Sequence, residues 1–235
     1  MSKGVFIIGT DTDVGKTVVS AGLMHLLRKN GYTACYFKPV LSGAIEDHRE
    51  LIPGDTRFVK TVANLEETLE NMTPYKFQTP VAPHLASKIE NIPIQVEVIK
   101  KSYQNLCEKY SYILAEGAGG LVVPLTEEGY MLYNLVLDFE LPIIIVARPG
   151  LGTINHTVMT VRYAQNLGIT VKGIIINGYD DANVCHMDNK ITIEKLTNVP
   201  ILGLIPILND IDVEKLQWGD LRECFEKNIS VDILF

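Results

Sequence analysis

The chain has 235 residues, of which 47% are hydrophobic and 21% are charged, and its formal net charge is −7. Nucleic-acid-binding proteins usually carry a basic stripe, so this acidic chain is expected to have no nucleic-acid partner. Neither a leader peptide nor an apolar run of membrane-spanning length is recognisable, which predicts a cytoplasmic protein with no membrane partner. The length suits a single domain over residues 1–235, and the motifs described below predict that it is a P-loop α/β domain.

Short apolar runs alternate with amphipathic stretches along the chain. The runs are continuous rather than alternating in polarity, which is typical of strands buried on both faces of a sheet. Strands are predicted at residues 5–8, 33–37, 111–115, 142–147, 171–176 and 199–204. Helices are predicted at residues 16–30, 94–110, 130–139 and 155–167. This order predicts an α/β fold with a doubly wound, mostly parallel sheet, which binds ligands beyond the carboxyl ends of its strands.

The first predicted strand leads into IGTDTDVGKT at residues 8–17, which has the spacing G-x-x-x-x-G-K-[ST] of a phosphate-binding loop. The loop amides and the helix N-terminus would face the phosphates. Lys16 can reach the β and γ oxygens, and the Thr17 hydroxyl can ligate Mg²⁺. The alternative is a chance match in an ordinary strand–helix turn, and the predicted strand and helix on either side argue against it.

The second predicted strand ends in FKPVLSG at residues 37–43. A lysine followed by proline and then Ser-Gly does not continue a regular strand. If this strand neighbours the first, Lys38 points toward the γ-phosphate and can stabilise charge on the transferring phosphoryl group. The residues leave open the alternative of a solvated surface lysine.

Two isolated carboxylates come next along the chain. Asp55 follows Pro53-Gly54, and the residues alone favour a helix N-cap there. Glu116 ends the third predicted strand and begins EGAGG at residues 116–120. A glutamate at a buried strand end is costly without a partner, so this segment resembles the acidic metal partner of P-loop enzymes more than a plain glycine turn.

The fifth predicted strand ends in Asn177-Gly178, and the sixth leads into Pro206-Ile207. The amide of Asn177 both donates and accepts hydrogen bonds, as reading the edge of a base requires. An ordinary Asn-Gly turn fits the same two residues equally well.

Taken together, GTDTDVGKT, KPVLSG, the isolated Asp55 and EGAGG resemble the motifs of dethiobiotin synthetase. The resemblance extends from the first strand to Pro206 and weakens over the last thirty or so residues. It implies a P-loop NTPase fold related to the nitrogenase iron protein, and a homodimer with two sites at the subunit interface. It also implies the reaction, in which 7,8-diaminononanoate, CO₂ and ATP give dethiobiotin, ADP and phosphate through a carbamate and a carbamic–phosphoric anhydride.

The resemblance also implies roles for individual residues. The catalytic groups would be Lys38, Lys16 and Thr12. The Mg²⁺ ligands would be Thr17, Asp55 and Glu116. The residues that line ATP would be Asp13, Val14, Gly15, Lys16, Thr17, Val18, Asp55, Glu116, Gly117, Ala118, Gly119, Ile176, Asn177, Pro206, Ile207 and Leu208. The substrate would contact Thr12, Lys38 and Ser42, and also Gly150, Leu151 and Asn155 of the partner subunit.

Some positions depart from the family pattern. Asp13 stands where the family often has glutamate, and Gly178 follows Asn177 where an acidic residue is frequent, which leaves the nucleotide preference open. Ala82 stands where serine is frequent, so one substrate hydrogen bond would be absent. We expect the carboxylates of Asp11 and Asp13 to point away from the phosphates, toward backbone, metal-bound water or the cationic diamine.

Two other classes of protein would share the phosphate loop. A nucleotide-switched ATPase that acts by binding partners would not explain KPVLSG so near the loop. A kinase of a small metabolite would need a lid rich in arginine, whereas the arginines of this chain are scattered.

Overall fold

The computed structural model describes residues 3–235 and is built around a six-stranded sheet in which every pairing is parallel. The strand order is β10-β9-β8-β1-β7-β2. The strands are β1 (Lys3–Gly9), β2 (Ala34–Phe37), β7 (Tyr112–Glu116), β8 (Ile143–Ala147), β9 (Val171–Tyr179) and β10 (Ile201–Pro206). Each corresponds to one predicted strand, so the predicted α/β class with a parallel sheet is confirmed.

Four helices correspond to the predicted ones, namely α1 (Lys16–Lys29), α5 (Val96–Lys109), α6 (Leu132–Asp138) and α7 (Thr153–Asn166). The structure also contains helices that the sequence patterns do not predict, namely α2 (Gly54–Ala63), α3 (Leu69–Met72), α4 (Pro83–Glu90), α8 (Val184–Thr197) and α9 (Leu221–Asn228), and the 3₁₀ helix η1 (Val231–Leu234). Three small two-stranded sheets were not predicted either. These pair β3 (Val40–Ser42) with β6 (Tyr75–Phe77), β4 (Ile45–Asp47) with β5 (Glu50–Ile52), and β11 (Ile211–Asp212) with β12 (Gln217–Trp218).

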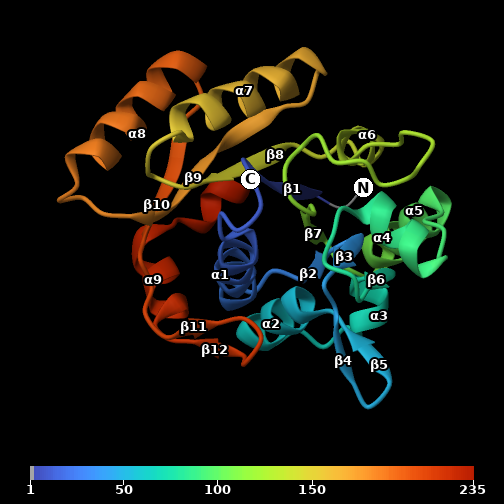
Figure 1. Cartoon of the computed structure of the whole chain (residues 1–235). Helices are drawn as coiled ribbons and strands as arrows, with labels where there is room; N and C mark the ends of the chain where they lie inside the picture. Colours follow the sequence, from blue (N-terminus) through green and yellow to red (C-terminus); the bar gives the residue numbers. More distant parts are fainter. Residues whose placement is uncertain (1–2) are drawn as a thin grey trace.

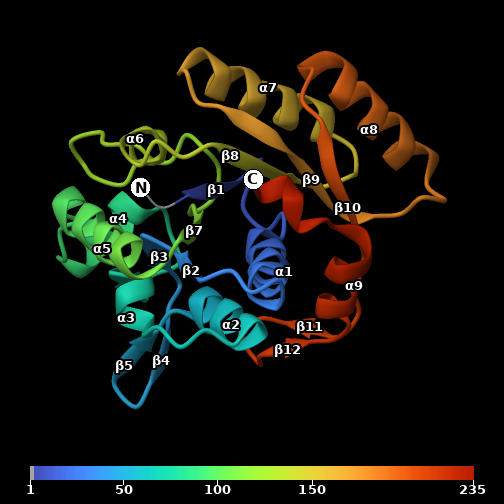
Figure 2. The ribbon, with the colours of Figure 1, turned by 180° about the vertical axis from the view of Figure 1, so that it is seen from behind.

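Helices cover both faces of the central sheet (Figure 1). The view from behind again places α1 and α9 on one side of the sheet and α7 and α8 together on the other (Figure 2). Gly22 of α1 makes the contact with α9 possible, because a Cβ at this position would collide with the Phe225 ring. The result is the three-layered packing expected of a doubly wound sheet.

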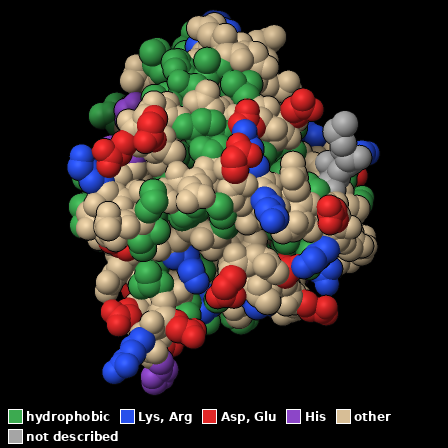
Figure 3. All heavy atoms as spheres, turned by 90° about the vertical axis from the view of Figure 1, so that its right-hand side faces the viewer, with side chains coloured by type: hydrophobic (Ala, Val, Ile, Leu, Met, Phe, Trp, Pro, Cys, Tyr) green, Lys and Arg blue, Asp and Glu red, His purple; other side chains and the backbone are tan. Residues whose placement is uncertain are grey.

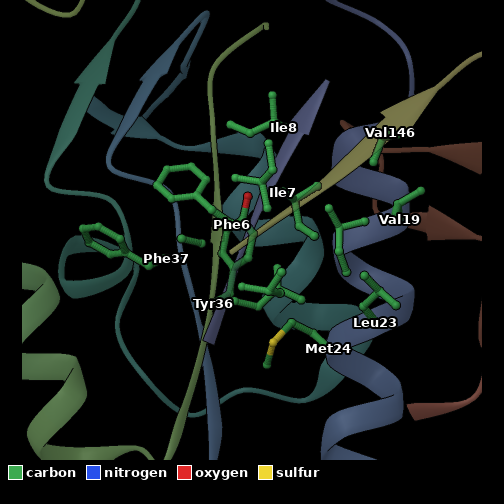
Figure 4. Packing of buried hydrophobic residues seen from close by; sticks show 14 of the residues in the cluster. Phe6, Ile7, Ile8, Val19, Leu23, Met24, Tyr36, Phe37 and Val146 are labelled. Atoms are coloured by element: carbon green, nitrogen blue, oxygen red, sulfur yellow. The ribbon is translucent and has the colours of Figure 1, made fainter. Parts of the chain in front are cut away.

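The alternation of side chains along the strands separates two packed layers of the core. Tyr36 lies on the side of the sheet that faces Leu23 and Met24 of α1, whereas Phe37 points to the opposite side (Figure 4). There the Phe37 ring is tilted against Tyr103 of α5, with 5.7 Å between the ring centroids. Both faces are therefore apolar, as the continuous hydrophobic runs predict.

The strand order corrects one expectation. β7 lies between β1 and β2, so the second strand does not neighbour the first. The phosphate loop follows the carboxyl end of β1, Glu116 ends β7, and Lys38 follows the carboxyl end of β2. The three motifs therefore meet at one edge of the sheet, even though the strand carrying Lys38 is one position farther from β1 than expected.

The surface seen from the right of Figure 1 carries acidic and basic side chains interspersed, with the β4–β5 hairpin projecting from it (Figure 3). His48 and Arg49 form the hairpin turn with φ angles of 49° and 69°. None of the helices in residues 3–235 combines the length and the apolar character needed to cross a membrane.

Candidate active site

The phosphate loop connects β1 to α1, as its sequence predicts. β1 ends at Gly9 and α1 begins at Lys16, with Gly15 as the N-cap at φ 90°. A Cβ at Gly15 would also collide with the amide of Asn177, so glycine is needed there both for its conformation and for this close approach. Lys16 is buried, and its Nζ donates to the Asp11 carbonyl at 3.0 Å. The helix N-terminus and one ammonium thus lie together at the loop, as anion binding requires.

The EGAGG segment lies directly beside this loop. Thr17 donates from Oγ1 to Oε1 of Glu116 at 3.2 Å, and the Glu116 side chain is fully buried. A Cβ built on Gly119 would stand 3.6 Å from Oγ1 of Thr12, and one on Gly120 would stand 3.5 Å from the Gly9 carbonyl. The structure therefore brings the end of β7 and the phosphate loop into one site, as the sequence analysis expected.

Lys38 is buried within the same site, so its interpretation as a solvated surface lysine is wrong. The residue is 4% exposed, and its backbone N–H donates to the Met72 carbonyl at 2.8 Å. Its Nζ donates to Oε1 of Glu116 at 2.7 Å and forms a second ion pair with Asp55. One ammonium is thus held between two carboxylates that come from different elements of the fold.

Asp55 has a different role from the one favoured by its local sequence. The N-cap of α2 is Pro53, and Asp55 lies in the first turn of the helix, so its interpretation as the N-cap is wrong. Its carboxylate instead pairs with Lys38. α2 lies beside α1 (Figure 1), and the interaction of Asp55 with Thr17 in the first turn of α1 brings the start of α2 close to the phosphate loop.

The charges of this cluster shift one another's ionisation. Burial alone would lower the pKa of Lys38, but the carboxylates of Asp55 and Glu116 outweigh burial and raise it above its usual range. Burial would likewise raise the pKa of Asp55, yet Lys38 lowers it. Burial lowers the pKa of Lys16, against the opposing attraction of Glu116. Lys38 is therefore a permanent cation at neutral pH, and Asp55 a permanent anion.

The oxygens of Thr17, Asp55 and Glu116 converge closely enough to suit a hard cation. Thr17 hydrogen-bonds to Glu116 and also interacts with the Asp55 carboxylate. No group of three or more His, Cys, Asp or Glu side chains within residues 3–235 is arranged as a metal site. Two carboxylates and a hydroxyl, with water and phosphate oxygens completing the shell, are what Mg²⁺ ordinarily uses. The residues present therefore fit Mg²⁺.

The two aspartates of the loop, Asp11 and Asp13, have different surroundings. Asp11 accepts the Thr12 backbone N–H at 2.8 Å with one carboxylate oxygen and pairs with Arg148 at 3.1 Å with the other. Its negative charge is thus directed to the backbone and to Arg148, which follows the end of β8. The sequence patterns did not indicate a role for this arginine. Asp13 is exposed and has a positive φ of 58°.

The candidate base-binding residues gather at the ends of β9 and β10. Asn177 lies within β9 rather than in a turn, so the Asn-Gly turn is wrong as an interpretation. Its amide nitrogen donates to the Val14 carbonyl at 3.1 Å, which connects it to the phosphate loop. A Cβ on Gly178 would stand 4.0 Å from both Ile207 and Pro149, which places the segment after β10 beside it.

The other residues expected to line ATP lie at this same edge of the sheet. They are Val18 in the first turn of α1, Gly117 and Ala118 after β7, Ile176 in β9, Pro206 at the end of β10, and Leu208 beyond it.

The expected substrate residues are only partly brought together. Lys38 belongs to the charged cluster described above, whereas Thr12 lies exposed in the phosphate loop near Gly119. Ser42 ends β3, and its Oγ is buried with no hydrogen-bond partner among residues 3–235, so it has a donor and an acceptor to offer a ligand. Leu151 is 96% exposed and Asn155 is also exposed, so both side chains face away from the buried cluster of Lys38 and Glu116.

Comparison with known sequences identifies close relatives of the chain. A family model described as an AAA domain matches residues 3–215. The chain is 54% identical to an ATP-dependent dethiobiotin synthetase BioD of Clostridium novyi, over 95% of this chain and 99% of that protein. It is 44% identical to an enzyme of the same name from Caldicellulosiruptor saccharolyticus, over 95% of this chain and 94% of that protein.

Comparison with solved structures extends the likeness of fold. The chain superposes on a ParA family ATPase from Chlorobium tepidum with a TM-score of 0.62 and 17% identity, over 99% of this chain and 98% of that one. It superposes on the septum site-determining protein MinD of Pyrococcus horikoshii, solved with Mg-ADP, with a TM-score of 0.60 and 16% identity. That match covers 100% of this chain and 95% of the other. At these identities the likeness concerns the fold alone.

Proposed function

Because the chain belongs to the ATP-dependent dethiobiotin synthetase family, we propose that it joins 7,8-diaminononanoate and CO₂ into the cyclic urea of dethiobiotin. Membership of the family makes the chain an ATP-dependent enzyme of the biotin pathway. In the proposed reaction ATP becomes ADP and phosphate, and residues 1–235 act as one P-loop domain. The observation that carries the proposal is the Lys38 ammonium held between Asp55 and Glu116, beside the phosphate loop.

In the first step an amine of the substrate takes up CO₂ as a carbamate and loses a proton. A carbamate oxygen then attacks the γ-phosphorus of ATP, the bond to the bridging oxygen breaks, and ADP leaves. The reactants are both anions and repel each other. Lys16 at the loop and Lys38 at the end of β2 would oppose that charge, while Thr12 and Ser42 would orient the carbamate.

In the second step the other amine attacks the carbamoyl carbon of the anhydride. The carbon–oxygen bond to the phosphoryl group breaks, phosphate leaves, and the amine loses a proton as the urea ring closes. Asp13 would help to attract the substrate, since an exposed carboxylate beside the loop attracts a cationic diamine. The nearby Thr12 and Gly119 would bound the space that the substrate occupies.

Thr17, Asp55 and Glu116 would hold Mg²⁺ between the protein and the ATP phosphates. Bound there, the ion would neutralise charge that develops on the transferring phosphoryl group. The three side chains carry the oxygen ligands that Mg²⁺ prefers. Asn177 would contact the base, and the apolar Ile207 would border it.

We further propose a homodimer in which Gly150, Leu151 and Asn155 serve the partner's site. The proposal is supported by exposed apolar side chains along α7 and the loop before it, where Leu151 is 96%, Met159 63% and Tyr163 38% exposed. Met159 and Tyr163 are four residues apart, so they share one face of the helix. The start of α7, with its exposed N-cap at Gly152, would offer its amides to the substrate carboxylate.

The function is tested by measuring ATP hydrolysis with and without 7,8-diaminononanoate plus bicarbonate, and by mass spectrometry of the product. The expected result is turnover stimulated by the diamine, with a product of dethiobiotin's mass that carries the label of ¹³C-bicarbonate. Hydrolysis that is indifferent to the diamine, with no cyclic urea formed, would contradict the proposal and favour an ATPase that acts through partners.

A further inference from the structure

We propose that Tyr36 is a positioning residue, whose hydroxyl holds the Glu116 carboxylate in the orientation that the metal and Lys38 require. The family motifs described above give Tyr36 no role in the site. The inference rests on the proposed role of Glu116 toward Mg²⁺, and it concerns how this particular chain keeps that side chain in place.

The sheet register brings the two side chains together. β2 pairs with β7 so that Tyr36 stands opposite Leu114, two residues before Glu116. Tyr36 and Glu116 therefore point to the same face of the sheet, as diagonal neighbours on adjacent strands. Neighbouring strands lie about 5 Å apart and two residues along a strand span about 6.5 Å, so the diagonal gap is about 8 Å, which an aromatic side chain can span. The phenol bridges it, and its hydroxyl donates to Oε2 of Glu116 at 2.9 Å.

The carboxylate oxygens of Glu116 are divided between two sets of partners. Oε2 accepts from the Tyr36 hydroxyl, whereas Oε1 accepts from Thr17 at 3.2 Å and Lys38 at 2.7 Å. The two oxygens are equivalent, so these partners fix the plane of the buried carboxylate, and turning it partway about its last bond would break both sets of hydrogen bonds. The bond to Tyr36 thereby keeps Oε1 directed at the phosphate loop, where a metal ligand is needed.

Tyr36 is itself rigidly placed. Its side chain is fully buried and lies toward Leu23 and Met24 of α1 (Figure 4). Phenylalanine would fit the same space and lose only the donor, which would leave Oε2 without the hydrogen bond that a buried carboxylate oxygen needs. Partners of this kind, which hold a metal ligand without touching the metal, typically change metal affinity about 10–100-fold when removed.

The test compares wild type with Tyr36→Phe by isothermal titration calorimetry of ADP, in Mg²⁺ and in EDTA. We expect Tyr36→Phe to bind ADP in EDTA within about twofold of wild type, because the loop amides are intact. We expect the enhancement of ADP binding by Mg²⁺ to fall about tenfold. In steady-state assays the Mg²⁺ concentration for half-maximal turnover should rise correspondingly, and excess Mg²⁺ should restore most of the turnover.

A matched control is Tyr112→Phe. Tyr112 is also buried, and its hydroxyl donates to the Leu234 carbonyl at 2.8 Å, so this variant loses a comparable bond at the start of β7, whereas Glu116 ends that strand. It should keep the full Mg²⁺ enhancement. An unchanged enhancement in Tyr36→Phe, or an equal loss in both variants, would overturn the positioning role alone. A wild type that binds ADP equally with and without Mg²⁺ would instead remove the metal assignment, and the role of Tyr36 with it.

Discussion

Nζ of Lys38 lies 2.7 Å from Oε1 of Glu116, although the two residues are 78 positions apart in the chain. The pairing exists because β2 and β7 are adjacent parallel strands that end at the same edge of the sheet. This one contact has two effects. The buried carboxylate gains a counter-charge, and the ammonium is held beside the loop where a phosphoryl group would transfer.

Replacing Lys38 by glutamine should lower turnover by about a hundredfold or more, because one cation opposing the transferring charge is lost. It should also lower the free energy of unfolding in EDTA by about 3 kcal/mol, because Glu116 is then buried without its counter-charge. Mg²⁺ bound together with ADP should restore much of this stability, because the ion would supply positive charge beside Glu116. Urea unfolding with and without Mg-ADP measures the second effect, and a near-wild-type rate would exclude Lys38 from the mechanism.

Asp13→Asn should weaken capture of the diamine more than binding of ATP. Asparagine tolerates the positive φ of this position, so the loop conformation should survive. Loss of one exposed charge near a cationic amine corresponds to about 1 kcal/mol, or roughly a fivefold rise in KM for the diamine. Separate KM values for the diamine and for ATP measure the effect, and equal increases in both would count against it.

Met159→Glu should dissociate the proposed homodimer. Placing an unpaired charge in an apolar interface costs several kcal/mol, so the dissociation constant should rise about a hundredfold or more. Sedimentation velocity measures the change, and turnover should fall with the dimer population. Val98→Glu on α5, at a position 40% exposed, is the control and should keep the wild-type assembly. A fully active monomer would refute the shared site.

Glu67 should contribute to acid stability. Burial would raise the pKa of its carboxyl, but the hydrogen bonds from Asn71 and Lys109 outweigh burial and lower the pKa to about 2. A lowered folded-state pKa means that the stabilisation is present above pH 4.5, the ordinary value, and is lost as the pH falls toward 2. The loss amounts to roughly 3 kcal/mol.

The matched variant for this effect is Glu67→Gln, which cannot titrate. Its free energy of unfolding should be lower than that of wild type at pH 7, and the difference should shrink steadily between pH 4.5 and 2. Chemical denaturation at a series of pH values gives this difference directly. A gap that stays constant with pH would mean that ionisation of Glu67 does not contribute to stability.

The sequence was most informative where a single local pattern determines the structure. The apolar run before GTDTDVGKT predicts both β1 and the start of α1, because a phosphate loop requires a strand before it and a helix after it. The short β3 and β6 strands were missed because three residues are too few for a periodicity. α8 was missed because its apolar side chains are mostly exposed, with Val184 74% and Ile191 61% accessible.

The sequence indicated which residues form the site, but not which of them lie next to one another. Lys38 was expected near the γ-phosphate on the premise that β2 adjoins β1, yet strand order depends on connections that apolar runs do not encode. Asp55 was favoured as an N-cap because its partner Lys38 lies on another element, seventeen positions away. Tyr36 was missed because a tyrosine in an apolar strand normally packs in the core, and only the register reveals its carboxylate partner.

The position of β2 at the edge of the sheet has a consequence for how the protein loses function. An edge strand is held by a single neighbour, so hydrogen exchange should show it opening at a lower free energy than β1, which is paired on both sides. Such an opening would remove Tyr36 and Lys38 from the site while leaving the phosphate loop intact. Under mild heat or denaturant, the chain should therefore stop making product while it still binds nucleotide.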